Sequence, residues 1–174
     1  MPSRRWNLLD ALVASVAFAY LFSFAPWLDA ADESFTLYAA KRVLQGDALY
    51  HDTFDFITPL SFYYYAAAFA VGGVDVTAAR FAMVLGNAIS AWLIYRLARR
   101  VASPIEGLVA AAFFIGGCVP VWNMASQHWL STMFCLAAAA ALLSERLAWA
   151  GVFLITLGVL GLNILARVLF RNKH

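Results

Sequence analysis

Two adjacent carboxylates, Asp32 and Glu33, are the side chains whose type and spacing best suit chemistry. They lie in residues 29–59, a polar stretch that holds six of the ten acidic residues and that lipid would not accommodate. A carboxylate placed there can accept a proton from a reacting hydroxyl group or hold that group by a hydrogen bond. Acids are also favourable in the first turn of a helix, so a capping role stays open beside the catalytic one.

Hydrophobic segments on both sides would place this polar stretch at a membrane surface. Of the 174 residues, 64% are hydrophobic and 13% are charged, whereas a typical soluble domain has about 25% charged residues. A stretch of about 20 apolar residues crosses a hydrocarbon core roughly 30 Å thick. The composition therefore predicts an all-α, polytopic membrane protein, and its net charge of +2 does not indicate nucleic acid as a partner.

We expect about five transmembrane helices in a single membrane domain, residues 1–174. One span precedes the polar stretch and the others follow it. The expected spans are residues 10–28, 76–98, 104–122, 126–143 and 147–168. Arg4 and Arg5 precede the first span, so the N-terminus is expected in the cytoplasm and the polar stretch on the outer face.

Two shorter helices are expected in the outer loop, residues 29–75. Residues 33–45 carry apolar side chains at three- and four-residue spacing, which predicts an amphipathic helix in the plane of the interface. Gly46 follows, where a left-handed helix end favours glycine. Residues 60–73 have a length typical of an interfacial or re-entrant segment. Counts of basic residues on the two faces are tied, so they leave open whether 60–73 crosses the membrane.

Three stretches of the chain together resemble a known family of membrane enzymes. They are DESFTLYAAKRVLQGDALYHDTFDFITPLSFYYYAAAFAVGG, AARFAMVLGNAISAWLIYRLARRVAS and ASQHWLSTMFCLAAAAALL. An acidic pair, an amphipathic helix ending in glycine, an aromatic-acidic loop and a proline before a tyrosine-rich helix resemble, in that order, the GT-C glycosyltransferases. The branch concerned is the bacterial dolichyl-phosphate-mannose-protein mannosyltransferase-like family, which includes the aminoarabinose transferases of lipid A. The resemblance covers roughly residues 5–146, and family members are several hundred residues long, so we expect a truncated or minimal module.

The resemblance implies a reaction, a location and a set of site residues. A sugar would pass from a polyprenyl-phosphate donor to an acceptor on the outer face of the bacterial inner membrane, with inversion at the sugar carbon. The catalytic acid of the family matches Asp32, with Glu33 beside it, and 60–73 would stay at the outer surface. The leaving phosphate needs cations or hydrogen-bond donors. The residues expected to meet this need are Lys41, Arg42, His51 and Arg80, and Asp55 and His128 are further substrate-binding candidates.

A second hypothesis assigns the same outer loop to binding without catalysis. The chain would then be a membrane remnant or an accessory subunit that binds lipid or a partner membrane protein. For His128, near the start of an expected span, a hydrogen-bonded packing role is the preferred interpretation, beside the functional one that an intramembrane histidine suggests. On either hypothesis no obligatory metal ion or other cofactor is expected, and membrane lipids are partners. The carboxylate of Asp32 separates the two hypotheses, because Asp32→Asn should abolish an enzyme's activity but cost a helix cap only about 1 kcal/mol.

Overall fold

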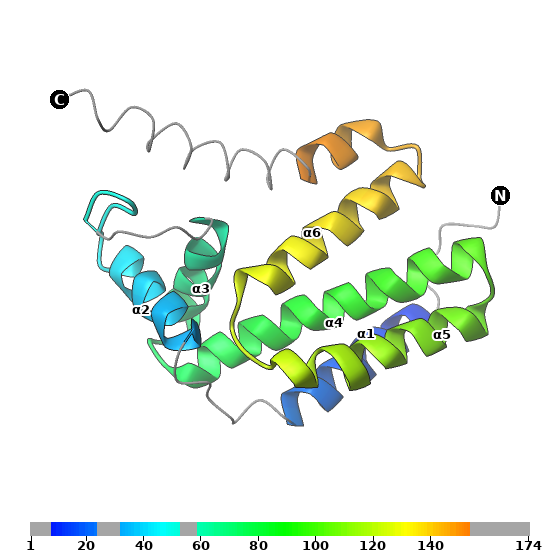
Figure 1. Cartoon of the computed structure of the whole chain (residues 1–174), viewed down its shortest axis with the longest axis horizontal. Helices are drawn as coiled ribbons and strands as arrows, with labels where there is room; N and C mark the ends of the chain where they lie inside the picture. The colour runs from blue at the N-terminus through cyan, green and yellow to red at the C-terminus, as the bar shows by residue number, and fades with distance from the viewer. Residues whose placement is uncertain (1–7, 24–31, 53–58, 154–174) are drawn as a thin grey trace.

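The computed structural model describes residues 8–23, 32–52 and 59–153, and the regular elements in these ranges are helices (Figure 1). The α-helices are α1 (Leu8–Ser23), α2 (Asp32–Leu44), α3 (Pro59–Gly72), α4 (Val76–Val101), α5 (Pro104–Phe113) and α6 (Gln127–Leu142). A further helical stretch occupies residues 147–153. The all-α fold class is therefore confirmed for the described residues.

Two helical segments in the described part are long and apolar enough to cross a membrane. One is α4, with 26 residues, and the other is Pro104–Trp122, with 19. The second segment continues from α5 through the π-helix η1 (Phe114–Cys118) into the 3-10 helix η2 (Pro120–Trp122). Pro120 lacks a backbone N–H and cannot continue an α-helix, which accounts for the change of helix type at this end.

The other expected spans are shorter than a bilayer crossing within the described residues. α1 and α6 have 16 residues each, and a span needs about 20. The expected first span continues to residue 28, but residues 24–31 lie outside the described residues. The last expected span, 147–168, is described as helix only to residue 153. Two spans are therefore supported by length and composition, and the five-span arrangement stays a prediction.

The two short helices of the expected outer loop, α2 and α3, pack against each other beside the start of α4 (Figure 1). Gly46 ends α2 in the left-handed region, with φ of +100°, so the predicted glycine termination is confirmed. Its N–H donates to the Val43 carbonyl at 3.0 Å, and that of Asp47 donates to the Arg42 carbonyl at 3.1 Å. These two bonds satisfy carbonyls that the last turn would otherwise leave open.

Helix α4 is the central element of the bundle, and α1, α3, α5 and α6 all pack on it. Asp75 caps its start by accepting a hydrogen bond from the Thr77 N–H at 2.7 Å. Near its other end lie the N-terminal ends of α1 and α5 and the C-terminal end of α6 (Figure 1). The bundle thus has two ends, one carrying α2 and α3 and the other carrying Arg96, Arg99 and Arg100 of α4.

Candidate functional site

Glu33, one of the two predicted catalytic acids, is fully buried in the first turn of α2 and is paired with Arg80 of α4. Its exposed fraction is 0%, and that of Arg80 is 2%. The Arg80 Nη2 donates to the Glu33 Oε2 at 2.6 Å, and the backbone N–H of Ala125 donates to the Glu33 Oε1 at 2.9 Å. The carboxylate therefore joins α2, α4 and the segment that precedes α6.

Arg80 completes this junction from the side of α4. Its Nη1 donates to the Asn123 carbonyl at 3.0 Å and lies 3.6 Å from the Met83 sulfur. Tyr65 of α3 packs beside the pair, and burial raises the pKa of its phenol, so this neighbour stays neutral. A buried ion pair offsets its loss of hydration only when further hydrogen bonds satisfy both charged groups. In the Glu33–Arg80 pair, both carboxylate oxygens and both terminal guanidinium nitrogens are engaged, whereas the buried Arg80 Nε makes no hydrogen bond among the described residues.

The burial of the Glu33–Arg80 pair limits what the two side chains can do. Both carboxylate oxygens of Glu33 accept hydrogen bonds from protein donors, and neither Glu33 nor Arg80 faces solvent. In this arrangement they hold the first turn of α2 in place instead of presenting charge to a ligand. Asp32 is the first residue of α2, and its side chain lies outside the described part of the structure.

Two predicted substrate-binding cations lie at the opposite end of α2. Lys41 and Arg42 occupy its last turn, eight to nine residues beyond Glu33 and thus roughly 12 Å along the helix axis. Lys41 is exposed. Arg42 contacts Tyr38 and forms an ion pair with Asp47, and these hydrogen bonds raise the pKa of its guanidinium. Lys41 is therefore the more accessible cation on this helix.

The remaining predicted residues fall in two different places. His51 is exposed in the loop after α2, where its Nδ1 lies 2.6 Å from the Asp52 Oδ1. A hydrogen bond from the Ala48 N–H, together with this histidine contact, lowers the pKa of Asp52. Asp55 lies outside the described residues. His128 is exposed in the first turn of α6, where its ring meets Trp122 edge-on at 6.3 Å between centroids.

The structure thus brings some of the predicted site residues together and separates others. Glu33 and Arg80 meet in one junction with the segment 123–126, and His128 follows that segment directly. Lys41, Arg42 and His51 gather around the far end of α2. Among the described residues, no group of three or more His, Cys, Asp or Glu side chains is placed to hold a metal ion.

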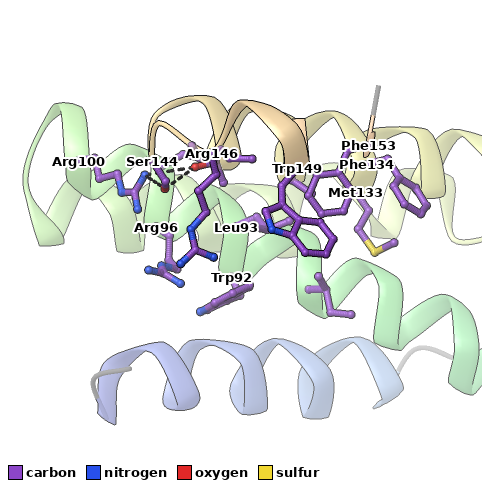
Figure 2. Close-up of a pocket in the computed structure, with 15 residues that line it drawn as sticks. Trp92, Leu93, Arg96, Arg100, Met133, Phe134, Ser144, Arg146, Trp149 and Phe153 are labelled. Carbon is purple, nitrogen blue, oxygen red and sulfur yellow. Dashed lines mark hydrogen bonds between the residues drawn. The ribbon is translucent and has the colours of Figure 1, made fainter. Parts of the chain in front are cut away.

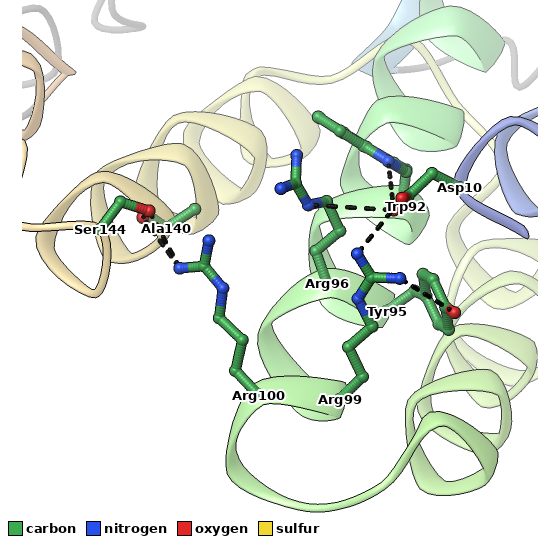
Figure 3. A network of polar contacts seen from close by, with 8 residues as sticks. All are labelled: Asp10, Trp92, Tyr95, Arg96, Arg99, Arg100, Ala140 and Ser144. Carbon is green, nitrogen blue, oxygen red and sulfur yellow. Dashed lines mark hydrogen bonds and ion pairs between the residues drawn. The ribbon is translucent and has the colours of Figure 1, made fainter. Parts of the chain in front are cut away.

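A second buried carboxylate, Asp10 of α1, forms a cluster that the sequence interpretation missed (Figure 3). Its exposed fraction is 1%. The Trp92 Nε1 and the Arg99 Nη2 each donate to it at 3.2 Å, and the Arg96 Nε lies 3.8 Å away. Two features of the sequence could have indicated this cluster. An acidic residue stands at the start of an apolar run, and two arginines of α4 are three residues apart, which places both on one helix face. We call these four residues the Asp10 cluster.

Comparison with known proteins adds no assignment to these observations. No protein-family model, curated protein or solved structure matches this chain. Indications of its function therefore come from the two buried clusters and from the helices that hold them.

Proposed function

We propose that this chain is a membrane module of a GT-C-type glycosyltransferase in which Asp32 is the catalytic base and Glu33 is its positioning residue. The observation that supports this proposal is the buried Glu33–Arg80 pair, which fastens the first turn of α2 to α4 and to the Ala125 backbone. Asp32 directly precedes Glu33 on that turn. A reacting carboxylate needs rigid support of this kind, because misplacement by about 1 Å can cost on the order of 100-fold in rate.

In the proposed reaction, the Asp32 carboxylate takes the proton of an acceptor hydroxyl as its oxygen attacks the anomeric carbon of a polyprenyl-phosphate sugar. The bond from that carbon to the phosphate oxygen breaks, and the phosphate leaves with the electron pair. Because the acceptor oxygen attacks from the face opposite the phosphate, the sugar carbon is inverted. Exposed cations stabilise the charge that develops on the phosphate. Lys41 suits this role, and His128 suits contact with the acceptor, because both side chains are exposed. Arg80 is assigned to the support of α2.

The proposed setting is a bacterial inner membrane, with the N-terminus in the cytoplasm and α2 and α3 on the outer surface. In this arrangement α4 and Pro104–Trp122 cross the bilayer, and three further spans complete the five expected from the sequence. The lengths and apolar composition of α4 and Pro104–Trp122 support the two central crossings. Arg96, Arg99 and Arg100 at the end of α4 agree with the excess of positive charge found in cytoplasmic loops.

The test is transfer of a labelled sugar from polyprenyl-phosphate donors by the full chain in lipid. Asp32→Asn should reduce transfer by about 100-fold or more, because a positioned general base contributes that much, while the thermal unfolding midpoint stays unchanged. Lys41→Gln should weaken donor binding with a smaller effect on the rate at saturation. Absence of transfer from folded wild-type protein, with every donor tried, would overturn the proposal.

A second candidate function is lipid or partner binding by the same loop without catalysis. The observation that favours it is the closure of Glu33 and Arg80 on each other, which leaves neither charge exposed for a reaction. This candidate predicts that the chain binds a polyprenyl phosphate but transfers no sugar, and that Asp32→Asn alters stability alone. Transfer that is lost in Asp32→Asn at unchanged stability would exclude it.

A further inference from the structure

A pocket of about 550 Å³ lies at the arginine end of the bundle, between α4, α6 and residues 146–153 (Figure 2). Its two ends differ in chemistry. Arg96, Arg100, Ser144 and Arg146 gather at one end, and Met133, Phe134 and Phe153 lie at the other, with Trp92, Leu93 and Trp149 between them (Figure 2). A volume of this size is typical of sites for small organic molecules.

The charged side chains that line the pocket in the described part are all arginines. Arg100 donates from its Nη1 to the Ser144 Oγ at 3.0 Å and to the Ala140 carbonyl at 3.5 Å, two neutral acceptors. Arg146 reaches into the pocket between Arg96 and Trp149 (Figure 2). Its side chain has no hydrogen bond or ion pair among the described residues. Planar guanidinium groups arranged in this way match the oxygens of a phosphate group.

The acidic residues at this end of the bundle do not neutralise the pocket. Asp10 is shared by Arg96 and Arg99 and also accepts from Trp92. Glu106 is engaged in the capping box at the start of α5, where its Oε2 accepts from the Ser103 N–H at 2.6 Å. Glu145 is exposed on the turn after α6 and does not line the pocket. The pocket therefore has positive charge available for an anion.

The apolar part of the pocket indicates what kind of anion would fit. Ile89 and Arg96 both line the pocket and are seven residues apart on α4, so the apolar surface extends roughly 10 Å beyond the arginines along the helix axis. A free phosphate ion would leave this surface empty. An amphiphile would cover it with hydrocarbon while its headgroup met the guanidinium groups. Basic pockets between helices on the cytoplasmic side of membrane proteins bind anionic lipid headgroups.

We propose that this pocket binds an anionic phospholipid, with the phosphate on Arg96, Arg100 and Arg146 and an acyl chain along Leu93, Met133 and Phe134. The site is separate from the proposed catalytic end, since Arg80 and Arg96 are 16 residues apart on α4, about 24 Å along its axis. It does not depend on sugar transfer. The phospholipid would bridge α4 and the polypeptide that follows α6.

The test counts lipids retained by the full chain in mild detergent, using native mass spectrometry. Phosphatidylglycerol is compared with phosphatidylcholine of the same acyl chains, and both are compared with soluble glycerol 3-phosphate. Wild-type protein should retain phosphatidylglycerol preferentially. The triple variant R96Q/R100Q/R146Q should bind it at least about 10-fold more weakly. The matched control K41Q/R42Q removes two charges at the other end of the bundle and should retain phosphatidylglycerol as wild type does.

Two single variants keep the test decisive if the triple variant does not fold. Arg146→Gln removes a charge that has no partner among the described residues, so its unfolding midpoint should be unchanged while phosphatidylglycerol binding weakens severalfold. Phe134→Asn should weaken lipid binding without changing binding of glycerol 3-phosphate. Equal retention of the two phospholipids, equal loss in the control variant, or full competition by glycerol 3-phosphate would each overturn the proposal.

Discussion

The Glu33–Arg80 pair and the Asp10 cluster both join a buried carboxylate to arginines of α4, yet they differ in how charge is matched. Glu33 meets one arginine, and the two side chains are 0% and 2% exposed. Asp10 is shared by Arg96 and Arg99, whose side chains are 23% and 19% exposed. A buried one-to-one pair, with both carboxylate oxygens and both terminal guanidinium nitrogens hydrogen-bonded, holds the helices together. A cluster with surplus, partly hydrated arginines keeps the capacity to bind an anion.

The difference follows from hydration. Removing a charge from water costs several kcal/mol per ion in the interior, so a deeply buried charge persists only with partners that offset this cost. Arginines that keep contact with solvent do not need one carboxylate each. The same α4 helix therefore carries a structural ion pair near its start and a recognition surface near its end.

The largest effect on stability is expected from breaking the Glu33–Arg80 pair. Arg80→Met would leave the Glu33 carboxylate buried without its cation, at a cost of about 3–5 kcal/mol. The double variant E33M/R80M should recover most of that loss, because no charge then remains buried at this junction. Thermal unfolding followed by circular dichroism in detergent measures both. A double variant as unstable as Arg80→Met would contradict the interpretation that each charge of the pair offsets the cost of burying the other.

A packing change next to the Asp10 cluster should have a smaller effect on stability. A Cβ added at Gly107 of α5 would lie 2.9 Å from the Tyr95 carbonyl oxygen and 3.3 Å from the Arg99 Cβ. Gly107→Ala should therefore force α4 and α5 apart and cost about 1–3 kcal/mol. Gly116→Ala is the matched control, since nothing lies within 4 Å of a Cβ added there. Equal unfolding midpoints for the two variants would show that the close approach of α4 and α5 is not needed.

Neutralising the carboxylate of the Asp10 cluster should cost less stability than breaking the Glu33–Arg80 pair. Asp10→Asn keeps an oxygen that can accept from Trp92, and Arg96 and Arg99 remain partly hydrated, so we expect a loss of about 1–2 kcal/mol. Because the variant also removes a competing anion, retention of phosphatidylglycerol should rise. Reduced retention in a variant that remains folded would argue against surplus positive charge as the source of binding.

The smallest effect on stability is expected at Asp75, the exposed N-cap of α4, near the Glu33–Arg80 pair. Hydrogen bonds from Thr77 lower the pKa of Asp75 below its usual value of 3.8. A carboxylate whose pKa is lower in the folded state stabilises the protein above its unfolded pKa, and that contribution is lost as the pH falls through the folded pKa. Stability should therefore decrease below about pH 4 more in the wild type than in Asp75→Asn. Identical pH profiles would show that the cap carries no linked proton.

Much of the helical framework could be predicted from local sequence. The apolar run that opens at residue 76 becomes α4, and the amphipathic pattern of 33–45 becomes α2, which ends before Gly46 as its left-handed conformation requires. These features depend on residue spacing and on the conformational freedom of one glycine. The expected five spans stay untested, because the described helices establish suitable length and composition for two.

The site could not be predicted in the same way, because its contacts join residues far apart in the chain. Glu33 meets Arg80 across 47 positions and Ala125 across 92, and Asp10 meets Arg99 across 89. Sequence alone determined which charges exist and that most of the chain around them is apolar. Only the tertiary structure decided which charges are enclosed as pairs and which remain available. The free energy of a charge depends on its partners and on its access to water. The packing of α1, α3 and α6 on α4, and of α2 on α3, sets both.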